Sequence, residues 1–266
     1  MNVVTNKLAS IGSLLTGFVR INHRLSSWVR ARWPGFFRAE RYKEDLRAEV
    51  LVACRSRERP RLLEVGGIDR PLFERSPEYV LDGLDIQYKE SCSRLYDNFV
   101  VGSIEEPLEN KYDVIFSLTL LEHVRNNTAA IGTIFRGLKA GGETHHYLPC
   151  KNHPYALCLR MVGPRFQRKL IQYLRPWAGL EETGYPTFFD HCSSKEMRRL
   201  LCQSGFENVE IKYYYRANDY FAFFFPLYLL IGVFGNICKV LNWKFFCAGM
   251  LISARKGVGS VEPGKE

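Results

Sequence analysis

The chain has 266 residues, of which 46% are hydrophobic, and it carries a formal net charge of +9. This composition supplies one substantial core, and we expect one domain with appendages. The eight cysteines include no Cys-x-x-Cys pair, and several lie in predicted helices or strands. These features argue against a disulfide framework and favour a reduced, cytosolic environment.

The positive charge is concentrated in two segments. Residues 1–39 contain six Lys or Arg and no acid, and residues 144–180 contain another six and again no acid. The remainder of the chain is slightly acidic. The basic character therefore indicates a local function of these two segments and not general solubility.

A basic amphipathic helix, or two, is predicted within residues 1–40. Its apolar positions follow a spacing of three and four, with only Asn22 out of pattern: Leu8, Ile11, Leu15, Phe18, Leu25 and Trp28. Trp33-Pro34-Gly35 closes the segment. Thr16, Gly17 and Arg20 interrupt the apolar run, which disfavours a cleavable secretory signal, and an organelle transit peptide is the alternative.

An alternation of strands and helices follows. We expect a helix over 42–58, strands near 61–66, 79–85, 97–102, 111–118 and 142–148, and a helix over 125–139. This order predicts an α/β fold with a doubly wound parallel sheet whose site lies at the carboxyl ends of its strands. A Ser193 cap with Glu196 starts a further helix, and strands are expected over 206–215 and 245–255.

Two carboxylates mark the first pair of strands. Glu64-Val65-Gly66 ends the first strand in a glycine turn, and Asp85 ends the second, 21 residues beyond Glu64. An acid at this position can accept hydrogen bonds from ribose hydroxyls. The spacing predicts an adenosine-containing cofactor.

An ordered series of motifs then narrows the family. After Asp85 come Gly102-Ser103-Ile104, a strand over 112–118, Leu121-Glu122-His123-Val124 and Gly141-Gly142. This series resembles the class I S-adenosylmethionine-dependent methyltransferases over about residues 45–150, although Gly66-Gly67 keeps only part of the family's glycine pattern. The resemblance implies a seven-stranded Rossmann-like sheet of order 3-2-1-4-5-7-6, with the last strand antiparallel, and S-adenosylmethionine as cofactor.

The same resemblance implies roles for individual residues. Glu64 would hold the cofactor's ammonium, directly or through water, Asp85 would accept the ribose hydroxyls, and Ile86 would pack on the adenine. The remaining cofactor-binding residues implied are Gly66, Gly67, Ser103, Ile104, Ser117 and Thr119.

Several histidines could serve as a general base. The predicted catalytic residues are His123, His145 and His191; His145 and His146 are expected to end the fifth strand at the mouth of the cleft, where alternation lets only one face the site. No histidine or cysteine pair has the spacing of a structural zinc site, so no metal is predicted.

Residues 150–192 are interpreted as a lid insertion that binds the acceptor. The segment mixes cations with aromatic rings, which suits phosphates or carboxylates beside a ring or an acyl chain. The substrate-binding residues predicted there are Arg165, Arg168, Lys169 and Tyr185. A solvated basic lid is the alternative.

The last insertion is unusually apolar. Tyr220 to Cys238 form 19 residues without a charge, within a hydrophobic helical hairpin over 219–243 between the last two strands. Pro226, Gly232 and Gly235 interrupt its apolar face. We favour an interfacial membrane contact, with a buried cap, a dimer surface or a true span as alternatives. The methyltransferase domain is placed at 41–256 and a disordered tail at 257–266.

These features predict a methyltransferase that is peripheral at the cytosolic membrane face, with a small or lipid-linked acceptor from a surface-glycan, isoprenoid or lipid pathway. The alternatives are an RNA methyltransferase, whose Asn/Asp-Pro-Pro-Tyr/Phe loop is replaced by Ser117-Leu118-Thr119-Leu120, and a non-catalytic membrane adaptor with a decayed cofactor fold. A nicotinamide dehydrogenase is disfavoured because the Gly-x-Gly-x-x-Gly series is missing. The oligomeric state is not predicted.

Overall fold

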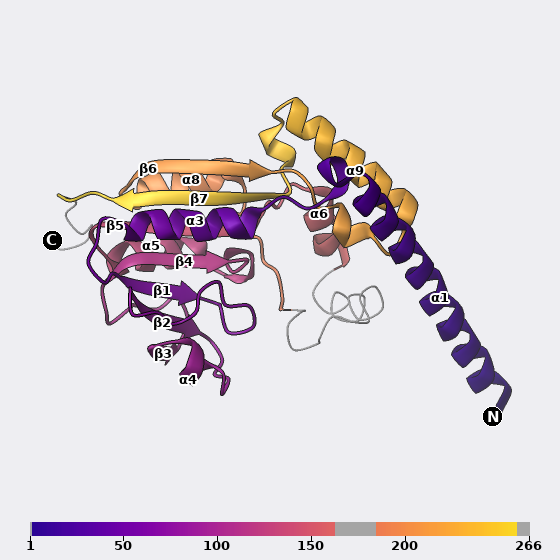
Figure 1. Cartoon of the computed structure of the whole chain (residues 1–266), viewed down its shortest axis with the longest axis horizontal. Coiled ribbons are helices and arrows are strands. Elements are labelled where there is room, and N and C mark those ends of the chain that lie inside the picture. The colour runs from indigo at the N-terminus through magenta and orange to yellow at the C-terminus, as the bar shows by residue number, and fades with distance from the viewer. Residues whose placement is uncertain (1, 163–184, 260–266) are drawn as a thin grey trace. The chain divides into compact units, whose positions relative to one another are not determined.

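The computed structural model describes residues 2–162 and 185–259, with the side chains of the first helix described from Thr16 onward (Figure 1). The chain divides into two compact units. We call residues 41–152, 187–213 and 249–266 the sheet unit, and residues 1–40, 153–186 and 214–248 the helical unit. The predicted acceptor-binding residues Arg165, Arg168 and Lys169, and most of the predicted tail, lie outside the described residues.

The sheet unit is built on seven strands in the order β3-β2-β1-β4-β5-β7-β6. They are β1 (Arg61–Val65), β2 (Val80–Asp85), β3 (Asn98–Val101), β4 (Tyr112–Leu118), β5 (Leu138–Pro149), β6 (Phe206–Tyr214) and β7 (Gly249–Lys256). The pairs from β3 to β5 are parallel, whereas β7 runs antiparallel to β5. The predicted strand order and the antiparallel last strand are confirmed.

Helices of the sheet unit pack on this framework. They are α3 (Tyr42–Cys54), α4 (Cys92–Leu95), the 3-10 turn η1 (Leu121–His123), α5 (Asn127–Gly137) and α8 (Ser194–Gln203). α3 packs against β4, β5 and β7, and α5 packs against β5 and α8. The predicted Ser193 cap is confirmed, since its side chain accepts a hydrogen bond from the Glu196 amide at the start of α8. The reciprocal half of the capping box differs, because the Ser193 amide donates to the His191 carbonyl.

Burial explains why the central strands form. In β1, Leu62, Leu63, Glu64 and Val65 are all buried, as expected for a parallel strand covered on both faces. Two predicted boundaries were wrong. β5 begins at Leu138 and continues to Pro149, and Phe245 lies in a 3-10 turn, so β7 begins only at Gly249.

The helical unit contains α1 (Asn2–Arg32), α2 (Pro34–Phe37), α6 (Pro154–Val162), η2 (Asn218–Phe221), α9 (Phe225–Val240) and η3 (Lys244–Phe246). Its core is formed by buried side chains of α1, α2, α9 and the η2–α9 junction: Val29, Phe37, Ala222 and Tyr228. Tyr228 stacks on Phe37 with ring centroids 5.6 Å apart. The basic N-terminal helix and the helical insertion between the last two strands are therefore both present.

The glycines of α9 have a different role from the one predicted. Gly232 and Gly235 are on the buried side of the helix. A Cβ on Gly232 would come within 2.7 Å of the Phe37 ring, and one on Gly235 within 2.5 Å of the Tyr215 carbonyl oxygen. They let α9 approach these neighbours closely and do not interrupt its exposed apolar face.

None of the eight cysteines, all of which lie in the described residues, forms a disulfide. Most are buried or half-buried, and only two are exposed: Cys158 in α6 of the helical unit, and Cys202 in α8 of the sheet unit. Within the described part of the chain, no helix has the length and hydropathy needed to span a membrane.

Candidate active site

The glycine turn after β1 opens the candidate site. Gly66 has a φ of +76°, which favours glycine, and its amide donates to the Leu84 carbonyl at 2.9 Å. Residues 66–79, which lead from this turn to β2, form turns and irregular backbone without a helix. The backbone after Gly66 is therefore held by side chains and not by helical hydrogen bonds.

Glu64 is the residue that holds this connection. Its carboxylate accepts hydrogen bonds from the Leu72 amide at 2.6 Å and the Tyr96 hydroxyl at 3.3 Å, and the residue is 1% exposed. Burial raises the pKa of its carboxyl group to about 7, against the hydrogen bonds from Leu72 and Tyr96. Glu64 thus fixes the loop that follows the glycine turn.

Gly67 completes the same arrangement. A Cβ at this position would lie 2.5 Å from the Tyr96 hydroxyl oxygen and 2.6 Å from the Glu64 carboxyl carbon. Any larger residue would push these two side chains apart. Gly67 is therefore required by the Glu64–Tyr96 contact, which the sequence pattern alone did not reveal.

Asp85 ends β2 at the carboxyl edge of the sheet. Its Oδ1 accepts from the Gln87 amide at 3.2 Å, and burial raises its pKa. Ile86 and Tyr88 follow with 62% and 57% of their surface exposed. A carboxylate acceptor beside exposed apolar side chains fits a nucleoside, which needs an acceptor for its hydroxyls and an apolar surface for its base.

The residues after β3 fit less well. The Ser103 hydroxyl accepts from the Glu105 amide at 3.2 Å, so one of its acceptor positions is used within the loop. Ile104, expected to contribute to the cofactor site, is 4% exposed and packs into the core. The glycine turn, Asp85 and Ile86 thus fit the predicted cofactor site and Ser103 fits it in part, whereas the Ile104 side chain is directed into the core.

Strain marks the carboxyl end of β4. Thr119 follows this strand with a φ of +54°, a rare conformation for a β-branched residue, and its amide donates to the Tyr147 carbonyl at 2.8 Å. Strained backbone persists only where the surroundings over-determine it, and it is concentrated at functional sites. Ser117, two residues earlier, is fully buried and its Oγ contacts the His146 ring at 2.7 Å.

His145 and His146 are not at the mouth of a cleft, and that expectation was wrong. β7 pairs with β5 as far as Pro149, so both histidines lie inside the strand and are 2% and 1% exposed. His145 Nδ1 contacts Ser253 Oγ at 2.9 Å, and His146 Nε2 contacts Thr144 Oγ1 at 2.5 Å. Burial lowers their pKa values to about 4 and about 3. Neither ring can serve an acceptor at the edge of the sheet.

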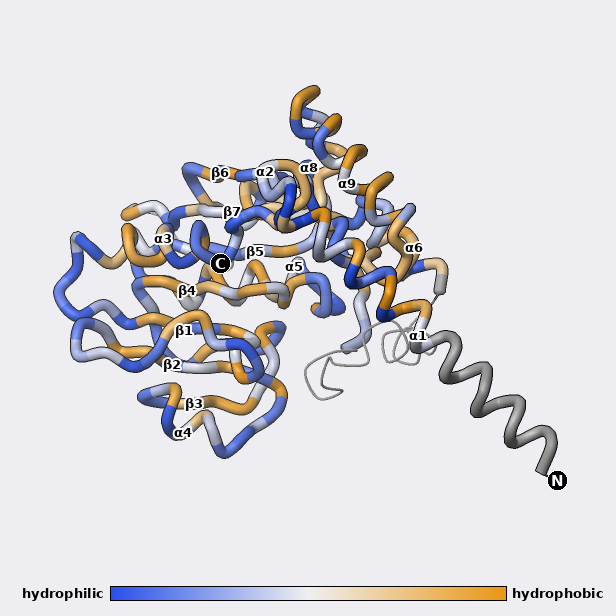
Figure 2. The backbone as a smooth tube through the Cα atoms, turned by 45° about the vertical axis from the view of Figure 1, so that its right-hand side comes forward, coloured by the Kyte–Doolittle hydropathy of each residue, from blue (hydrophilic) through white to orange (hydrophobic). Residues whose placement is uncertain are grey.

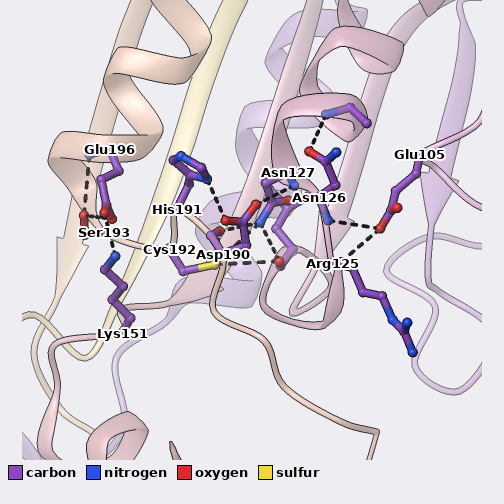
Figure 3. Close-up of polar contacts among 12 residues, drawn as sticks. Glu105, Arg125, Asn126, Asn127, Lys151, Asp190, His191, Cys192, Ser193 and Glu196 are labelled. Carbon is purple, nitrogen blue, oxygen red and sulfur yellow. Dashed lines mark hydrogen bonds and ion pairs between the residues drawn. The ribbon is translucent and has the colours of Figure 1, made fainter.

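The other two candidate bases lie beside the loop that follows β4. His123 ends η1, with Nε2 3.7 Å from Glu122 Oε1. His191 Nδ1 lies 2.8 Å from Asp190 Oδ1, and the His191 side chain is 44% exposed. Figure 3 shows the His191 ring directed toward Asp190, with Asn127 beyond it. The segment carrying Asp190 is tied to this loop, because the Phe188 and Phe189 amides both donate to the Glu122 carbonyl.

Asp190 and Asn127 are site residues that sequence reasoning did not identify. Asp190 Oδ2 accepts from the Asn127 amide at 2.8 Å, and the Asn127 side chain donates to the Asp190 carbonyl at 2.6 Å. The available signal was an acid directly before His191. Tyr185, predicted to bind the acceptor, is half-buried and belongs to the helical unit. Among the described residues no group of three or more His, Cys, Asp or Glu is placed to hold a metal ion.

Comparisons with known proteins agree with this geometry. A family model described as a methyltransferase domain matches residues 37–211. A ubiquinone biosynthesis O-methyltransferase of Pseudomonas entomophila (strain L48) is 24% identical over 110 residues, which are 40% of this chain and 44% of that protein. The match thus spans less than half of the curated relative's length.

The chain is also similar to solved structures. A putative sarcosine dimethylglycine methyltransferase from Galdieria sulphuraria has a TM-score of 0.50 and 14% identity, over 83% of this chain and 86% of that one. A phosphoethanolamine N-methyltransferase 2 of Haemonchus contortus, solved in complex with S-adenosyl-L-methionine, has a TM-score of 0.48 and 12% identity, over 80% of this chain and 52% of that one.

Proposed function

Because the chain belongs to the methyltransferase-domain family and has its class I, S-adenosylmethionine-dependent fold, we propose that it methylates a small or lipid-linked acceptor while bound peripherally at a membrane surface. The acceptor would come from a lipid, isoprenoid or surface-glycan pathway. The cofactor supplies an activated methyl group, so the protein has mainly to bind and orient the two reactants. Asp85 would accept the ribose hydroxyls, the Gly66 backbone would lie against the methionine part, and Ile86 would cover the base.

A substitution of Asp85 tests whether the cofactor binds at this edge of the sheet. Replacing Asp85 by Ala should weaken the binding of S-adenosylhomocysteine by about 1.5–3 kcal/mol, the range for hydrogen bonds to a charged group, in calorimetry. The exposed Glu90, five residues further along, provides the control, since Glu90→Ala should leave the affinity unchanged. Equal affinity of the Asp85→Ala variant and the wild-type protein would refute this placement of the cofactor.

The membrane part of the proposal depends on the exposed face of α1. Val19, Asn22, Ser26 and Val29 are buried on one side of this helix. Its large apolar side chains lie on the adjacent face, about 100° around the helix, and are 42–61% exposed: Phe18, Ile21, Leu25 and Trp28. We call these four residues the α1 stripe. An exposed apolar stripe on a helix is typical of an interaction surface.

A second stripe lies on α9, which Figure 2 shows as a largely hydrophobic helix. Its exposed residues recur every three or four positions and are 42–84% exposed: Leu230, Val233, Ile237 and Val240. Phe224, directly before α9, stacks on Phe18 of the α1 stripe with ring centroids 6.3 Å apart. The apolar surfaces of the two helices therefore meet at this end, within one folded unit.

Charge favours an anionic bilayer as the partner. Arg20, Arg24 and Arg32 are exposed on α1, and each basic residue close to an anionic membrane contributes about 1 kcal/mol. Two weak attachments, one electrostatic and one apolar, together give the stable binding that either alone would not give. Within the apolar segment 220–238 not every residue is available for this contact, because Phe221 and Ile231 are buried.

Liposome flotation tests this surface. Replacing Ile21, Leu25 and Trp28 together by Ser should weaken binding to vesicles of phosphatidylcholine and phosphatidylglycerol at every salt concentration. Arg20→Gln with Arg24→Gln should weaken it only at low salt.

The matched control removes exposed apolar side chains of the sheet unit, by Leu51→Ser, Val52→Ser and Val100→Ser, and should leave flotation unchanged. If the wild-type protein does not float, or if the α1 substitutions instead dissociate a dimer in solution, the stripe is not a membrane surface.

A further inference from the structure

His191 differs from the other predicted bases in the access to its ring. His145 and His146 are enclosed by the sheet, as described above. The His191 side chain is 44% exposed, compared with 29% for His123, and its Nδ1 atom lies 2.8 Å from Asp190 Oδ1. When Nδ1 donates its proton to a carboxylate, the neutral ring carries its free electron pair on Nε2, the atom that can accept a proton.

Asp190 is itself fixed from three directions. Its second carboxylate oxygen accepts the Asn127 amide at 2.8 Å, and its carbonyl accepts from the Asn127 side chain at 2.6 Å and from the Cys192 thiol at 3.2 Å. Asn127 begins α5, directly after the loop at the carboxyl end of β4. A base held by an acid, which is held in turn by the fold, is the arrangement of an oriented general base.

The backbone around this pair is strained. Phe189 and His191 have φ values of 53° and 52°, although neither is glycine. The Glu122 carbonyl accepts the Phe189 amide at 3.1 Å, and the Ser193 amide donates to the His191 carbonyl at 2.9 Å. Strained backbone on both sides of Asp190 is consistent with a segment whose conformation is fixed by its surroundings.

The charged groups beside the ring come from three segments. Asp190 precedes His191, Glu196 lies in the first turn of α8, and Lys151 follows β5 (Figure 3). Lys151 Nζ is 2.6 Å from Glu196 Oε1, so these two charges offset each other. Asp190 is the carboxylate in direct contact with His191.

We infer that His191 is the general base of methyl transfer and that Asp190 is its positioning residue; this inference rests on the proposed function. The acceptor must then present a hydroxyl, or an amine that carries a proton. As the acceptor oxygen or nitrogen bonds to the methyl carbon, its proton passes to His191 Nε2, and the electrons of the breaking carbon–sulfur bond remain on sulfur. A methylated acceptor, S-adenosylhomocysteine and an imidazolium result, and the imidazolium then returns its proton to water.

The ring itself provides a test that needs no acceptor. In nitrogen-detected NMR of the full chain at pH 8, His191 should be the tautomer with the proton on Nδ1, whereas a histidine free in water prefers the proton on Nε2. Asp190→Asn should shift this population toward the tautomer with the proton on Nε2. A wild-type ring with its proton on Nε2 would overturn the inference.

Kinetics provide the second test, with methyl-labelled S-adenosylmethionine and a total lipid extract as acceptor. His191→Gln should slow label transfer by about 10²–10⁴-fold and abolish the fall of the rate at acid pH, while His123→Gln should change the rate far less.

Calorimetry with S-adenosylhomocysteine distinguishes a failure of the His191 assignment from a failure of the proposed function. If the His191→Gln variant binds it normally and transfers label within about threefold of wild type with an unchanged pH profile, His191 is not the base. If the wild-type protein does not bind it at all, the proposed function fails instead.

Discussion

The first helix and the first strand of the sheet differ in where they place their apolar residues. β1 buries Leu62 and Leu63 almost completely, whereas α1 leaves Leu25 and Trp28 exposed and buries Asn22 and Ser26. The strand is covered on both faces, so its interior has to be apolar. The buried side of α1 instead meets backbone donors and acceptors of the η2–α9 junction, and polar side chains satisfy them. Hydropathy therefore identifies the interior of the sheet unit, whereas the buried side of α1 combines the apolar Val19 and Val29 with the polar Asn22 and Ser26.

Two hydrogen bonds show how α1 is attached. Asn22 Oδ1 accepts from the Phe225 amide at 2.7 Å, which satisfies a donor at the start of α9, and Ser26 Oγ donates to the Ala222 carbonyl at 3.3 Å. Four residues further, Arg30 pairs with Asp219 at 3.2 Å. These three side chains, spaced by four, fix the rotation of α1 and hence the direction in which its apolar stripe points.

The largest effect should come from the apolar core of the helical unit. Tyr228→Ala should destabilise this unit by about 3–5 kcal/mol, because the ring is fully buried between Phe37 and Phe225. Leu230→Ala, two residues along and 63% exposed, should change its stability by less than about 0.5 kcal/mol. Hydrogen exchange of the α9 amides measures both. Equal effects of the two substitutions would mean that the exposed stripe is also core.

The free energy of unfolding should depend on pH by about 3 kcal/mol through the Glu64 carboxyl group, which is buried in the sheet unit. Burial raises the pKa of Glu64 from 4.5 to about 7, so the folded protein holds this proton more tightly than the unfolded chain. Its contribution to stability is present below pH 4.5 and is lost as the pH rises through 7. Glu64→Gln should remove that loss.

The measurement compares urea unfolding at pH 5 and pH 8. The Glu64→Gln variant should gain about 3 kcal/mol over wild type between the two, whereas the exposed Glu106→Gln should not. Parallel pH profiles of wild type and Glu64→Gln would show that this carboxyl titrates normally.

Making α1 more regularly apolar should weaken its attachment. Asn22→Leu improves the hydropathy pattern but leaves the Phe225 amide without its partner, at a cost of about 1–3 kcal/mol. Arg24→Leu, at an exposed position two residues further, should be close to neutral. Stabilisation of the helical unit by Asn22→Leu, measured by exchange of the α1 and α9 amides, would contradict the polar attachment.

The smallest effect concerns the ion pair at the other end of this contact. Arg30 and Asp219 are 43% and 36% exposed, so Arg30→Gln should cost less than about 1 kcal/mol, and the loss should diminish with added salt. A salt-independent loss above this size would indicate a buried role for Arg30.

Much of the sheet unit could be predicted because its pattern is local. The mostly apolar run Leu62–Val65 indicates a buried strand, and Asp85 marks the end of the next strand. The order of the motifs along the chain then predicts the topology of the sheet. The position of His145 could not be predicted in this way, since it depends on how far β7 extends along β5. Likewise, the sequence places Ile104 close to the end of β3, but the packing of the core determines the direction of its side chain.

The face of α1 could not be predicted because its partner is about 200 residues away in sequence. Asn22 interrupts the apolar period of the helix. Its hydrogen bond with the Phe225 amide explains why a polar residue is buried at this position. The Asp190–Asn127 contact is similar, since 63 residues separate the two. Sequence patterns indicate which residues prefer burial, whereas long-range hydrogen bonds decide which polar residues can be buried.

The two exposed cysteines supply natural attachment points for spectroscopic labels. Cys158 is in the helical unit and Cys202 in the sheet unit, while the other six thiols are buried or half-buried. A pair of nitroxide spin labels introduced without any mutation would report the distribution of distances between the units by pulsed electron resonance. The same Cys158 label would report immersion in lipid by its collisions with oxygen, so one doubly labelled sample follows both docking on vesicles and motion between the units.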